Sequence, residues 1–480
     1  MKNFDPYKRT ILFVASFINV CLMTVLFVHV WYNYYQQTMY VIQFYRKGNY
    51  VIFMLYALLL FFFSNMYGNL KIGQLRRIEV MLSQYLSLFL TNAVIYIVIS
   101  LLAFGFVSPY HLALMMVAEM VVSSLWNILV IKVYNRIFQP WKLLYIYGER
   151  PGVDLVYKLE TRKDKYTIYD AIHIDEGLEA IGEKMENYQA VIIGDISAIK
   201  RNDVLKYCYA RKKRAYVIPK ISDIILMGTD RIHIFDTPFL LSRGYTLSAD
   251  QRFVKRAMDI VLSLILLILS SPIMLCAMIA IKLDDGGEIF YRQVRCTRYE
   301  KNFTIYKFRS MVMDAEKDGE ARLARENDER ITRVGRFIRA ARIDELPQLI
   351  NILKGDMSFV GPRPERPEIM EEYCRTMPEF PFRNRVKAGL TGFAQIYGKY
   401  NTTPYDKLKL DLFYIANYSF WTDIKLILMT VKTLLRPDST QGVEEDQITA
   451  ERAATEIREG EVEAVVKEMR QTETAYTNDN

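Results

Sequence analysis

Two adjacent acidic residues, Asp344 and Glu345, precede a short apolar segment in the C-terminal half of the chain. Pro347 suits the first turn of a helix and Gly355 suits its end, so the sequence predicts a helix whose N-terminus carries both carboxylates. The helix dipole favours the ionised forms of acidic groups at this end. An ionised aspartate can attack phosphorus, and two carboxylates can hold Mg²⁺ together with substrate phosphate oxygens. An aspartate that only caps the helix would give the same local pattern.

Positively charged side chains accompany this acidic pair. Lys307 and Arg309 alternate in an apolar run, so on a strand they would share one face and could grip one anion. Arg363 stands on a Gly-Pro-Arg-Pro turn, and Arg385 and Lys387 precede a glycine-containing loop. Each of these cations alone could be a solvated surface residue. Together they indicate a site that clamps phosphoryl groups.

Histidine and cysteine usage limits the chemistry further. The chain has four histidines, none of them after His233, so any reaction in the C-terminal half must proceed without imidazole. The five cysteines lie far apart and form no CxxC pair. This spacing excludes a disulfide scaffold and a cysteine-rich zinc module.

An apolar run at residues 259–281, within a helix expected at residues 254–283, precedes these motifs and has basic residues on both sides, which favours the cytoplasmic face for both ends. Pro272 lies near its middle and should kink a helix there, and the hydroxyl of Ser271 can bond a carbonyl that the proline leaves unpaired. Each half is about 18 Å of helix, too short for a hydrocarbon core of about 30 Å. We therefore expect a re-entrant membrane helix broken at Ser271 and Pro272. The alternative is a kinked fifth span that would export the rest of the chain.

Residues 1–136 contain four further apolar stretches, each near the length that crosses a bilayer as a helix. Lysine and arginine concentrate before the first stretch, between the second and third, and after the fourth. This bias predicts a four-helix transmembrane bundle with both ends in the cytoplasm. Glu119 lies inside the fourth stretch; a structural hydrogen bond to a neighbour such as Asn92 is favoured over a functional role.

Residues 137–245 alternate short β-rich runs with amphipathic helical ones, which predicts a Rossmann-like α/β domain with a parallel sheet. The first strand–helix turn, residues 148–152, lacks the GxGxxG pattern of dinucleotide-binding proteins. A structural or regulatory domain is therefore favoured over a nucleotide-binding one. Residues 437–480 are acidic, almost free of aromatics, and expected to be a disordered tail.

The net charge of +8, combined with the acidic tail, leaves a basic body. Its positive charges flank apolar segments and do not form a helix- or sheet-borne patch. We therefore expect a membrane as partner, and no nucleic acid.

Five motifs, KFRSM, DELPQL, KGDMSFVGPRPE, GLTGFAQ and DLFYIANYSFWTDIKLI, occur between Arg252 and Arg436. In these motifs the chain resembles the bacterial polyprenyl-phosphate sugar-1-phosphate transferases, the monotopic phosphoglycosyl transferases. The resemblance implies a C-terminal α/β monotopic catalytic domain over residues 252–436, entering the membrane through the re-entrant helix. A four-span bundle and a Rossmann-like domain ahead of it match the layout of the large, fused members of this family. The whole chain is thus expected to be a multi-domain membrane protein.

The resemblance also implies a two-step reaction. Asp344 would attack the β-phosphate of a UDP-sugar and release UMP, and undecaprenyl phosphate in the inner leaflet would accept the phosphosugar from the enzyme. Glu345 would assist, with Mg²⁺ bound by the two carboxylates. The residues implied in binding substrate phosphate or nucleotide are Lys307, Arg309, Arg363, Arg385, Lys387, Gln395 and Asp411.

This reaction would be the first membrane step of exopolysaccharide, capsule or O-antigen (lipopolysaccharide) synthesis, at the cytoplasmic face of the plasma membrane. Two alternatives stay open: an inactive membrane scaffold, and a membrane-anchored nucleotide-sugar-modifying enzyme that uses NAD(P) in the middle domain. The identity of the sugar and any homo-oligomerisation stay open as well.

Overall fold

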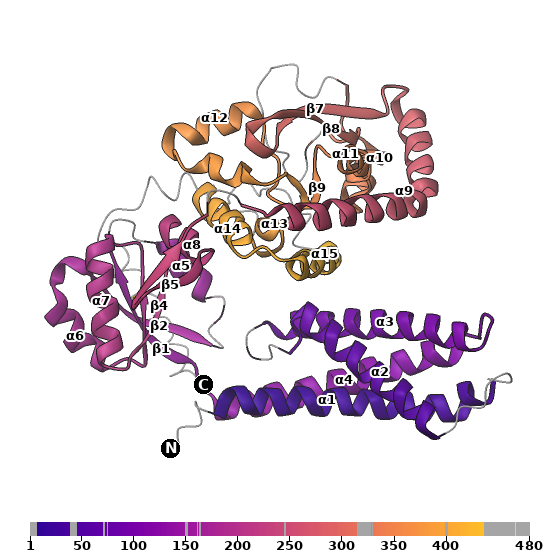
Figure 1. Cartoon of the computed structure of the whole chain (residues 1–480), viewed down its shortest axis with the longest axis horizontal. Helices are drawn as coiled ribbons and strands as arrows, with labels where there is room; N and C mark the ends of the chain where they lie inside the picture. Colours follow the sequence, from indigo (N-terminus) through magenta and orange to yellow (C-terminus); the bar gives the residue numbers. More distant parts are fainter. Residues whose placement is uncertain are drawn as a thin grey trace, which may run out of the picture. The chain divides into compact units, whose positions relative to one another are not determined.

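The computed structural model describes residues 7–38, 46–70, 73, 75–148, 152–160, 162, 165–243, 246–313, 328, 330–398, 402–435 and 466. The chain divides into two compact units, with the boundary between Ile218 and Pro219. Figure 1 shows the course of the chain through the elements of each unit. Apart from Val466, the acidic tail at 437–480 lies outside the described residues.

Four long helices form the N-terminal part: α1 (Lys8–Val30), α2 (Arg46–Tyr67), α3 (Arg77–Leu102) and α4 (Tyr110–Ile137). Each is long and apolar enough to cross a membrane. Both α1 and α3 pack against α2 and against α4, and the four run side by side in Figure 1. The chain is therefore a membrane protein.

Polar side chains fill part of the interior between these helices. The Glu119 carboxylate is fully buried and accepts hydrogen bonds from the Tyr56 hydroxyl and, at 2.7 Å, from the Asn92 amide. The hydrogen bond to Asn92 that the sequence favoured is thus confirmed. A carboxylate in an apolar bundle needs such donors because unpaired burial of the charge would be costly.

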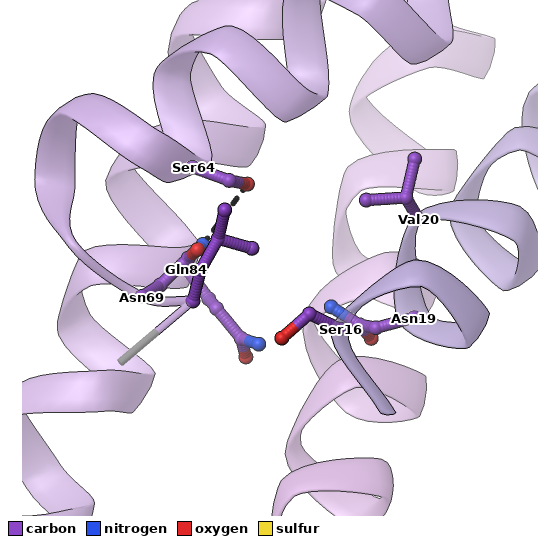
Figure 2. Close-up of a pocket in the computed structure, with 7 residues that line it drawn as sticks. Ser16, Asn19, Val20, Ser64, Asn69 and Gln84 are labelled. Atoms are coloured by element: carbon purple, nitrogen blue, oxygen red, sulfur yellow. Dashed lines mark hydrogen bonds between the residues drawn. The ribbon is translucent and has the colours of Figure 1, made fainter. Parts of the chain in front are cut away.

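A second polar cluster lies between α1, the end of α2 and α3 (Figure 2). The Asn69 amide donates to the Ser64 hydroxyl at 3.1 Å, and Ser16 and Gln84 point toward one another. Ser16 Oγ, Asn19 Oδ1 and Asn69 Oδ1 are buried and have no hydrogen-bond partner among the residues that the structure describes. Such atoms in a polar cavity are ordinarily satisfied by ordered water.

The middle segment contains a parallel sheet of four strands in the order β2-β1-β3-β4. The strands are β1 (Trp141–Tyr147), β2 (Tyr166–His173), β3 (Ala190–Ile193) and β4 (Arg214–Val217). The connecting helices are α5 (Val153–Glu160), α6 (Leu178–Glu186) and α7 (Ala198–Ala210). The apolar faces of α6 and α7 pack on one face of the sheet. The alternation in the sequence thus corresponds to parallel strand–helix–strand units.

Space after β1 is limited, although residues 149–151 of the expected turn lie outside the described residues. A side chain at Gly148 would come within 2.9 Å of Ile196 and 3.1 Å of Ile174. In a dinucleotide-binding fold the pyrophosphate approaches the backbone at this turn. At Gly148, close packing against Ile174 and Ile196 accounts for the glycine without any nucleotide.

The C-terminal unit begins with helix α8 (Ile221–Met227) and a hairpin of β5 (Asp230–Ile234) and β6 (Thr237–Leu241). Residues 137–245 were expected to form the middle domain, yet Ile221 and Ile224 of α8 belong to the hydrophobic core of the C-terminal unit. The sheet of the middle domain ends before this helix, at Val217.

The rest of the C-terminal unit is an α/β domain built around short strands. Its strands are β7 (Phe290–Cys296), β8 (Asn302–Phe308), β9 (Ser358–Val360) and β10 (Gly389–Thr391). Its α-helices are α9 (Ala249–Asp285), α10 (Arg333–Ala340), α11 (Gln348–Lys354), α12 (Pro367–Thr376), α13 (Phe393–Tyr397), α14 (Pro404–Ala416) and α15 (Phe420–Leu434). The described part of this unit also has three 3₁₀ turns, η5 (Arg298–Glu300), η6 (Ile343–Glu345) and η7 (Phe380–Arg385). β7 pairs antiparallel with β8, and β9 pairs parallel with β10.

Helix α9 carries the apolar segment expected to re-enter the membrane, and Figure 1 shows that it changes direction sharply along its length. Pro272 lies inside the helix and has no N–H for the carbonyl of Ile268, and the Ser271 hydroxyl donates to that carbonyl at 2.8 Å. The expected hydroxyl–carbonyl bond is therefore present. The helix is not broken at Ser271 and Pro272, contrary to the prediction from the sequence. It continues through the proline as one bent helix, because the serine hydroxyl bonds the carbonyl that the proline leaves free.

Both halves of α9 pack against the same domain. The first half contacts α11, β9 and α15, and Arg256 donates to the carbonyls of Ile352 and Leu353 at 2.6 Å. The second half packs Ala277 and Ile281 against Ile338 of α10. Between these anchors most of the large aliphatic side chains are exposed.

Candidate active site

Asp344 and Glu345 lie on the turn η6, between α10 and α11. Arg342, the residue before this turn, adopts a left-handed backbone conformation with φ 51°, which reverses the chain after α10. Helix α11 then starts after Pro347 and ends at Gly355, which has φ 97°. The helix ending predicted from Gly355 is confirmed, and the two carboxylates precede its first turn.

Glu345 is held by cations on three sides. Its Oε1 lies 3.1 Å from Lys307 Nζ and 3.2 Å from Arg363 Nη2, and its Oε2 lies 3.9 Å from Arg342 Nη1. Burial alone would raise the pKa of Glu345, but the charges of Lys307, Arg363 and Arg342 hold it well below its ordinary value. Glu345 is therefore ionised at neutral pH and fixed in place.

Asp344 has no hydrogen-bond or ion-pair partner among the described residues. Burial, followed by the charge of Glu345, raises the pKa of Asp344 to about 6, against the opposing charges of Lys307, Arg339 and Arg342. The sequence predicted that the helix dipole would favour ionisation of both carboxylates; for Asp344, burial and the like charge beside it outweigh that effect. At neutral pH Asp344 is therefore still mostly ionised.

Lys307 and Arg309 do not converge on one group. Lys307 lies at the end of β8 and pairs with Glu345, whereas Arg309 follows the strand and forms an ion pair with Asp285 at the end of α9. Only 8% of the Arg309 side chain is exposed, and it packs so closely on Gly287 that a Cβ there would overlap its guanidinium. Arg309 thus joins α9 to the strand that carries Lys307.

Asp411 is 1% exposed and forms a buried ion pair with Arg383, at 2.9 Å from Nε and 2.7 Å from Nη2. The same guanidinium donates to the Arg363 carbonyl at 3.1 Å and to Glu365 at 3.3 Å. The Glu365 carboxylate also contacts Lys407 at 3.1 Å. Burial would raise the pKa of Glu365, but Arg383 and Lys407 lower it to about 2. Asp411 therefore reaches the site indirectly, through the loop that carries Arg363.

Arg383, which organises this network, is not among the residues that the sequence predicts for the site. The sequence predicts Arg385, two positions further along the same arginine-rich motif. Arg385 is exposed and lies over the ring of Phe382, 5.2 Å from its centroid. No local signal in the sequence separates these two arginines; the acidic partners Asp411 of α14 and Glu365 identify Arg383 as the buried one.

Lys387 lies away from the acidic pair, and Gln395 forms no hydrogen bond with it among the described residues. Lys387 Nζ would be 3.4 Å from a Cβ at Gly355, which places it at the C-terminal end of α11, whereas the acidic pair precedes its N-terminal end. A helix of this length spans about 10 Å. The Gln395 amide donates to the Leu390 carbonyl at 3.2 Å, and its buried Oε1 has no partner. Gln395 thus retains a free acceptor.

A protein-only metal site is not present within the described part of the chain, where no group of three or more His, Cys, Asp or Glu side chains is arranged to hold an ion. Asp344 and Glu345 do fit Mg²⁺, which commonly takes one or two carboxylates and completes its shell with substrate phosphate oxygens and water. The donor set therefore suits a metal that arrives with a phosphorylated substrate.

Residues 250–437 match the family model described as bacterial sugar transferase. Over 186 residues the chain is 42% identical to a UDP-N-acetylgalactosamine-undecaprenyl-phosphate N-acetylgalactosaminephosphotransferase of Aeromonas hydrophila, covering 38% of this chain and 44% of the relative. It is 40% identical over 209 residues to a UDP-glucose:undecaprenyl-phosphate glucose-1-phosphate transferase of Escherichia coli, covering 42% and 43%.

A shorter relative is matched almost completely. An uncharacterized sugar transferase of Bacillus subtilis is 39% identical over 199 residues, which cover 42% of this chain and 95% of that protein. The chain spans less than half the length of the two longer relatives, and the family model matches the part of the chain that holds Asp344 and Glu345. The chain therefore belongs to the bacterial sugar transferase family of membrane enzymes.

Proposed function

We propose that this protein transfers a sugar-1-phosphate from a UDP-sugar to undecaprenyl phosphate, giving undecaprenyl-diphosphate-sugar and UMP. The main support is that Asp344, which has no hydrogen-bond or ion-pair partner among the described residues, adjoins Glu345, which is clamped by Lys307 and Arg363. One carboxylate is free to react, and the cations beside it can compensate phosphate charge. The names of the Aeromonas and Escherichia relatives describe this type of transfer.

In the first step an Asp344 oxygen attacks the β-phosphorus of the UDP-sugar. A new P–O bond forms to the carboxylate, the bond between the β-phosphorus and the bridging oxygen breaks, and UMP leaves with that electron pair. The carboxylate needs no general base because it is ionised at neutral pH, its pKa being about 6. The phosphosugar remains on the enzyme as an acyl phosphate.

In the second step a phosphate oxygen of undecaprenyl phosphate attacks the same phosphorus. The diphosphate bond forms, and the bond to Asp344 breaks with return of the electron pair to the carboxylate. Lys307 and Arg363 stay beside the reacting phosphate in both steps, held by Glu345 at 3.1 and 3.2 Å. The two-step route suits one soluble and one membrane-held substrate, since the two need not be bound together.

Mg²⁺ is proposed as the cofactor. Asp344, Glu345 and the donor phosphates would hold it, and when bound it would neutralise charge on the phosphate oxygens. With or without Mg²⁺, the residues of this chain position the Asp344 carboxylate and the cations beside it.

We also propose that α9 enters the membrane and returns on the cytoplasmic side. A straight helix of 37 residues would be about 55 Å long, and its ends could not both reach one small domain. Both halves of α9 pack on the catalytic domain, while most of the large aliphatic side chains between them are exposed. The site would then lie at the inner leaflet, where it could initiate exopolysaccharide, capsule or O-antigen synthesis.

The test uses purified full-length protein in lipid nanodiscs with undecaprenyl phosphate, Mg²⁺ and a panel of UDP-sugars. We expect UMP release with at least one sugar, and a phosphosugar adduct on Asp344 by mass spectrometry when the acceptor is omitted. Asp344→Asn should release no UMP while remaining folded in the membrane fraction. Lipid product formed without any adduct, or by Asp344→Asn at the wild-type rate, would refute the covalent route.

The same experiment separates the alternatives. An inactive scaffold would release UMP from no donor. An NAD(P)-dependent enzyme would show bound cofactor by absorbance or fluorescence and would alter the sugar without releasing UMP.

A further inference from the structure

An acidic residue, Asp259, stands on α9 among aliphatic residues. Only 2% of it is exposed, whereas its neighbours Val261, Leu264 and Ile265 are about half exposed. A carboxylate buried on a lipid-embedded helix is costly unless hydrogen bonds compensate it. Its partners therefore indicate what the residue is for.

The partners of Asp259 are on strand β9. Its Oδ1 accepts a hydrogen bond from Ser358 Oγ at 3.0 Å and another from the Phe359 N–H at 3.0 Å. The opposite edge of β9 pairs with β10, where the Ser358 N–H donates to the Ala388 carbonyl at 2.9 Å. Successive N–H groups of a strand point to opposite edges. Asp259 thus takes the place of a third strand for the outward-facing N–H of Phe359.

Strand β9 leads directly into the loop that carries Arg363. Only Gly361 and Pro362 separate the strand from Arg363, whose Nη2 lies 3.2 Å from Glu345. The backbone at Gly361 is closely packed, because a Cβ there would come within 2.2 Å of the Lys387 carbonyl. A displacement of β9 is therefore passed on to the guanidinium.

A second contact ties the same strand to the start of α9. The Tyr414 hydroxyl lies 3.4 Å from the Val360 carbonyl and 2.7 Å from Asp423, and Lys255 of α9 approaches that hydroxyl at 3.2 Å. Lys255 and Asp423 form a buried ion pair at 2.6 Å. The membrane helix therefore contacts β9 directly through Asp259 and indirectly through Tyr414.

We propose that Asp259 is a positioning residue that ties the lipid-embedded helix α9 to the loop of Arg363. The position of α9 in the bilayer then determines where the Arg363 guanidinium lies relative to Glu345. The catalytic consequence rests on the proposed function; the tie between helix and strand does not.

The first measurement is hydrogen–deuterium exchange of residues 357–363 in full-length protein in nanodiscs. Asp259→Ala removes the acceptor, so the Phe359 amide should exchange at least about tenfold faster. Asp259→Asn keeps an acceptor oxygen of the same shape and should protect this amide as the wild type does. Ser263→Ala is the matched control, because Ser263 is buried on the same helix but its hydroxyl bonds only the backbone carbonyl of Asp259.

The second measurement is the rate of UMP release. Asp259→Ala should lower kcat roughly ten- to hundredfold, since small displacements of a positioning group cost this much. Asp259→Asn and Ser263→Ala should stay within about threefold of the wild type. In an Arg363→Lys background, Asp259→Ala should add less than about threefold, because its effect passes through the guanidinium. A residue needed only for folding would lower activity by the same factor in both backgrounds.

Ser358→Ala serves if Asp259→Ala fails to fold, since it deletes one of the two hydrogen bonds and should give a smaller change in the same direction. Unchanged exchange at Phe359 in both variants would overturn the tie. Faster exchange with wild-type kcat, or full additivity with Arg363→Lys, would overturn the positioning role. A wild-type protein that released no UMP from any donor would refute the proposed function, and the exchange result would still decide the tie.

Discussion

The pH dependence of the first half-reaction tests the state of Asp344 directly. Burial and the charge of Glu345 raise the pKa of Asp344 to about 6, while the attack on phosphorus needs the ionised carboxylate. Activity should therefore fall as the pH decreases through about 6 and level off above about 7. At about pH 5 roughly one tenth of Asp344 is ionised, whereas an aspartate with an ordinary pKa would be more than nine-tenths ionised. The rate should thus drop about tenfold between neutral pH and pH 5.

The assay is single-turnover UMP release with donor alone, which isolates formation of the enzyme-bound phosphosugar. Mg²⁺ is kept well below saturation, because bound Mg²⁺ would itself lower the pKa of Asp344 and the rate must report the metal-free pair. Circular dichroism and exposure to pH 5 followed by return to pH 7.5 show whether any loss is reversible and unrelated to unfolding. Glu345→Gln removes the neighbouring negative charge and leaves Lys307 and Arg363 in place, so it should lower the pKa of Asp344 and shift the inflection to lower pH. A rate independent of pH between 5 and 8, or an inflection that moves upward in Glu345→Gln, would refute this account of the pair.

Three other perturbations have expected results. Pro272→Ala restores the backbone N–H that the Ile268 carbonyl lacks, so α9 should straighten. Part of the protein should then place its C-terminus outside the cell, which protease protection measures. An entirely internal C-terminus with normal turnover would show that the proline does not enforce the bend. Asp411→Asn leaves Arg383 with a weaker buried partner and should destabilise the C-terminal unit by about 3 kcal/mol in denaturant unfolding, and an unchanged midpoint would contradict this. EDTA should abolish UMP release, with recovery on adding Mg²⁺ and no change in melting temperature; full turnover in EDTA would exclude the proposed metal.

Local chemistry in this chain was readable from short motifs. The types and spacing of Asp344, Glu345, Lys307 and Arg363 indicated an acidic pair among cations, and the structure places both cations next to Glu345. The apolar stretches indicated membrane helices because helix length and side-chain hydropathy are local properties. The bend of α9 was equally local, since it depends on one proline and the serine before it.

The ion-pair partner of each charged residue could not be predicted from the sequence. Arg309 pairs with Asp285, and Asp411 pairs with Arg383, across separations of 24 and 28 residues. Nothing in the sequence distinguishes a cation that faces a ligand from one that is neutralised inside the fold, because the difference depends on tertiary contacts. The raised pKa of Asp344 is of the same kind, since burial by surrounding elements outweighs the local helix dipole.

The packing of α8 bears on how the catalytic part can be produced as a separate fragment. Ile221 and Ile224 are inserted among the apolar side chains of the C-terminal unit, and Gly228 approaches α14 so closely that a Cβ there would lie 2.8 Å from the Ala416 carbonyl. A fragment that begins at residue 252, where the recognisable motifs start, would lack α8. The apolar surface that Ile221 and Ile224 cover would then be exposed to water. A fragment that begins at or before Pro219 would keep this apolar surface covered by α8. The solubility of the isolated fragment therefore depends on about thirty residues before residue 252, which belong to no catalytic motif.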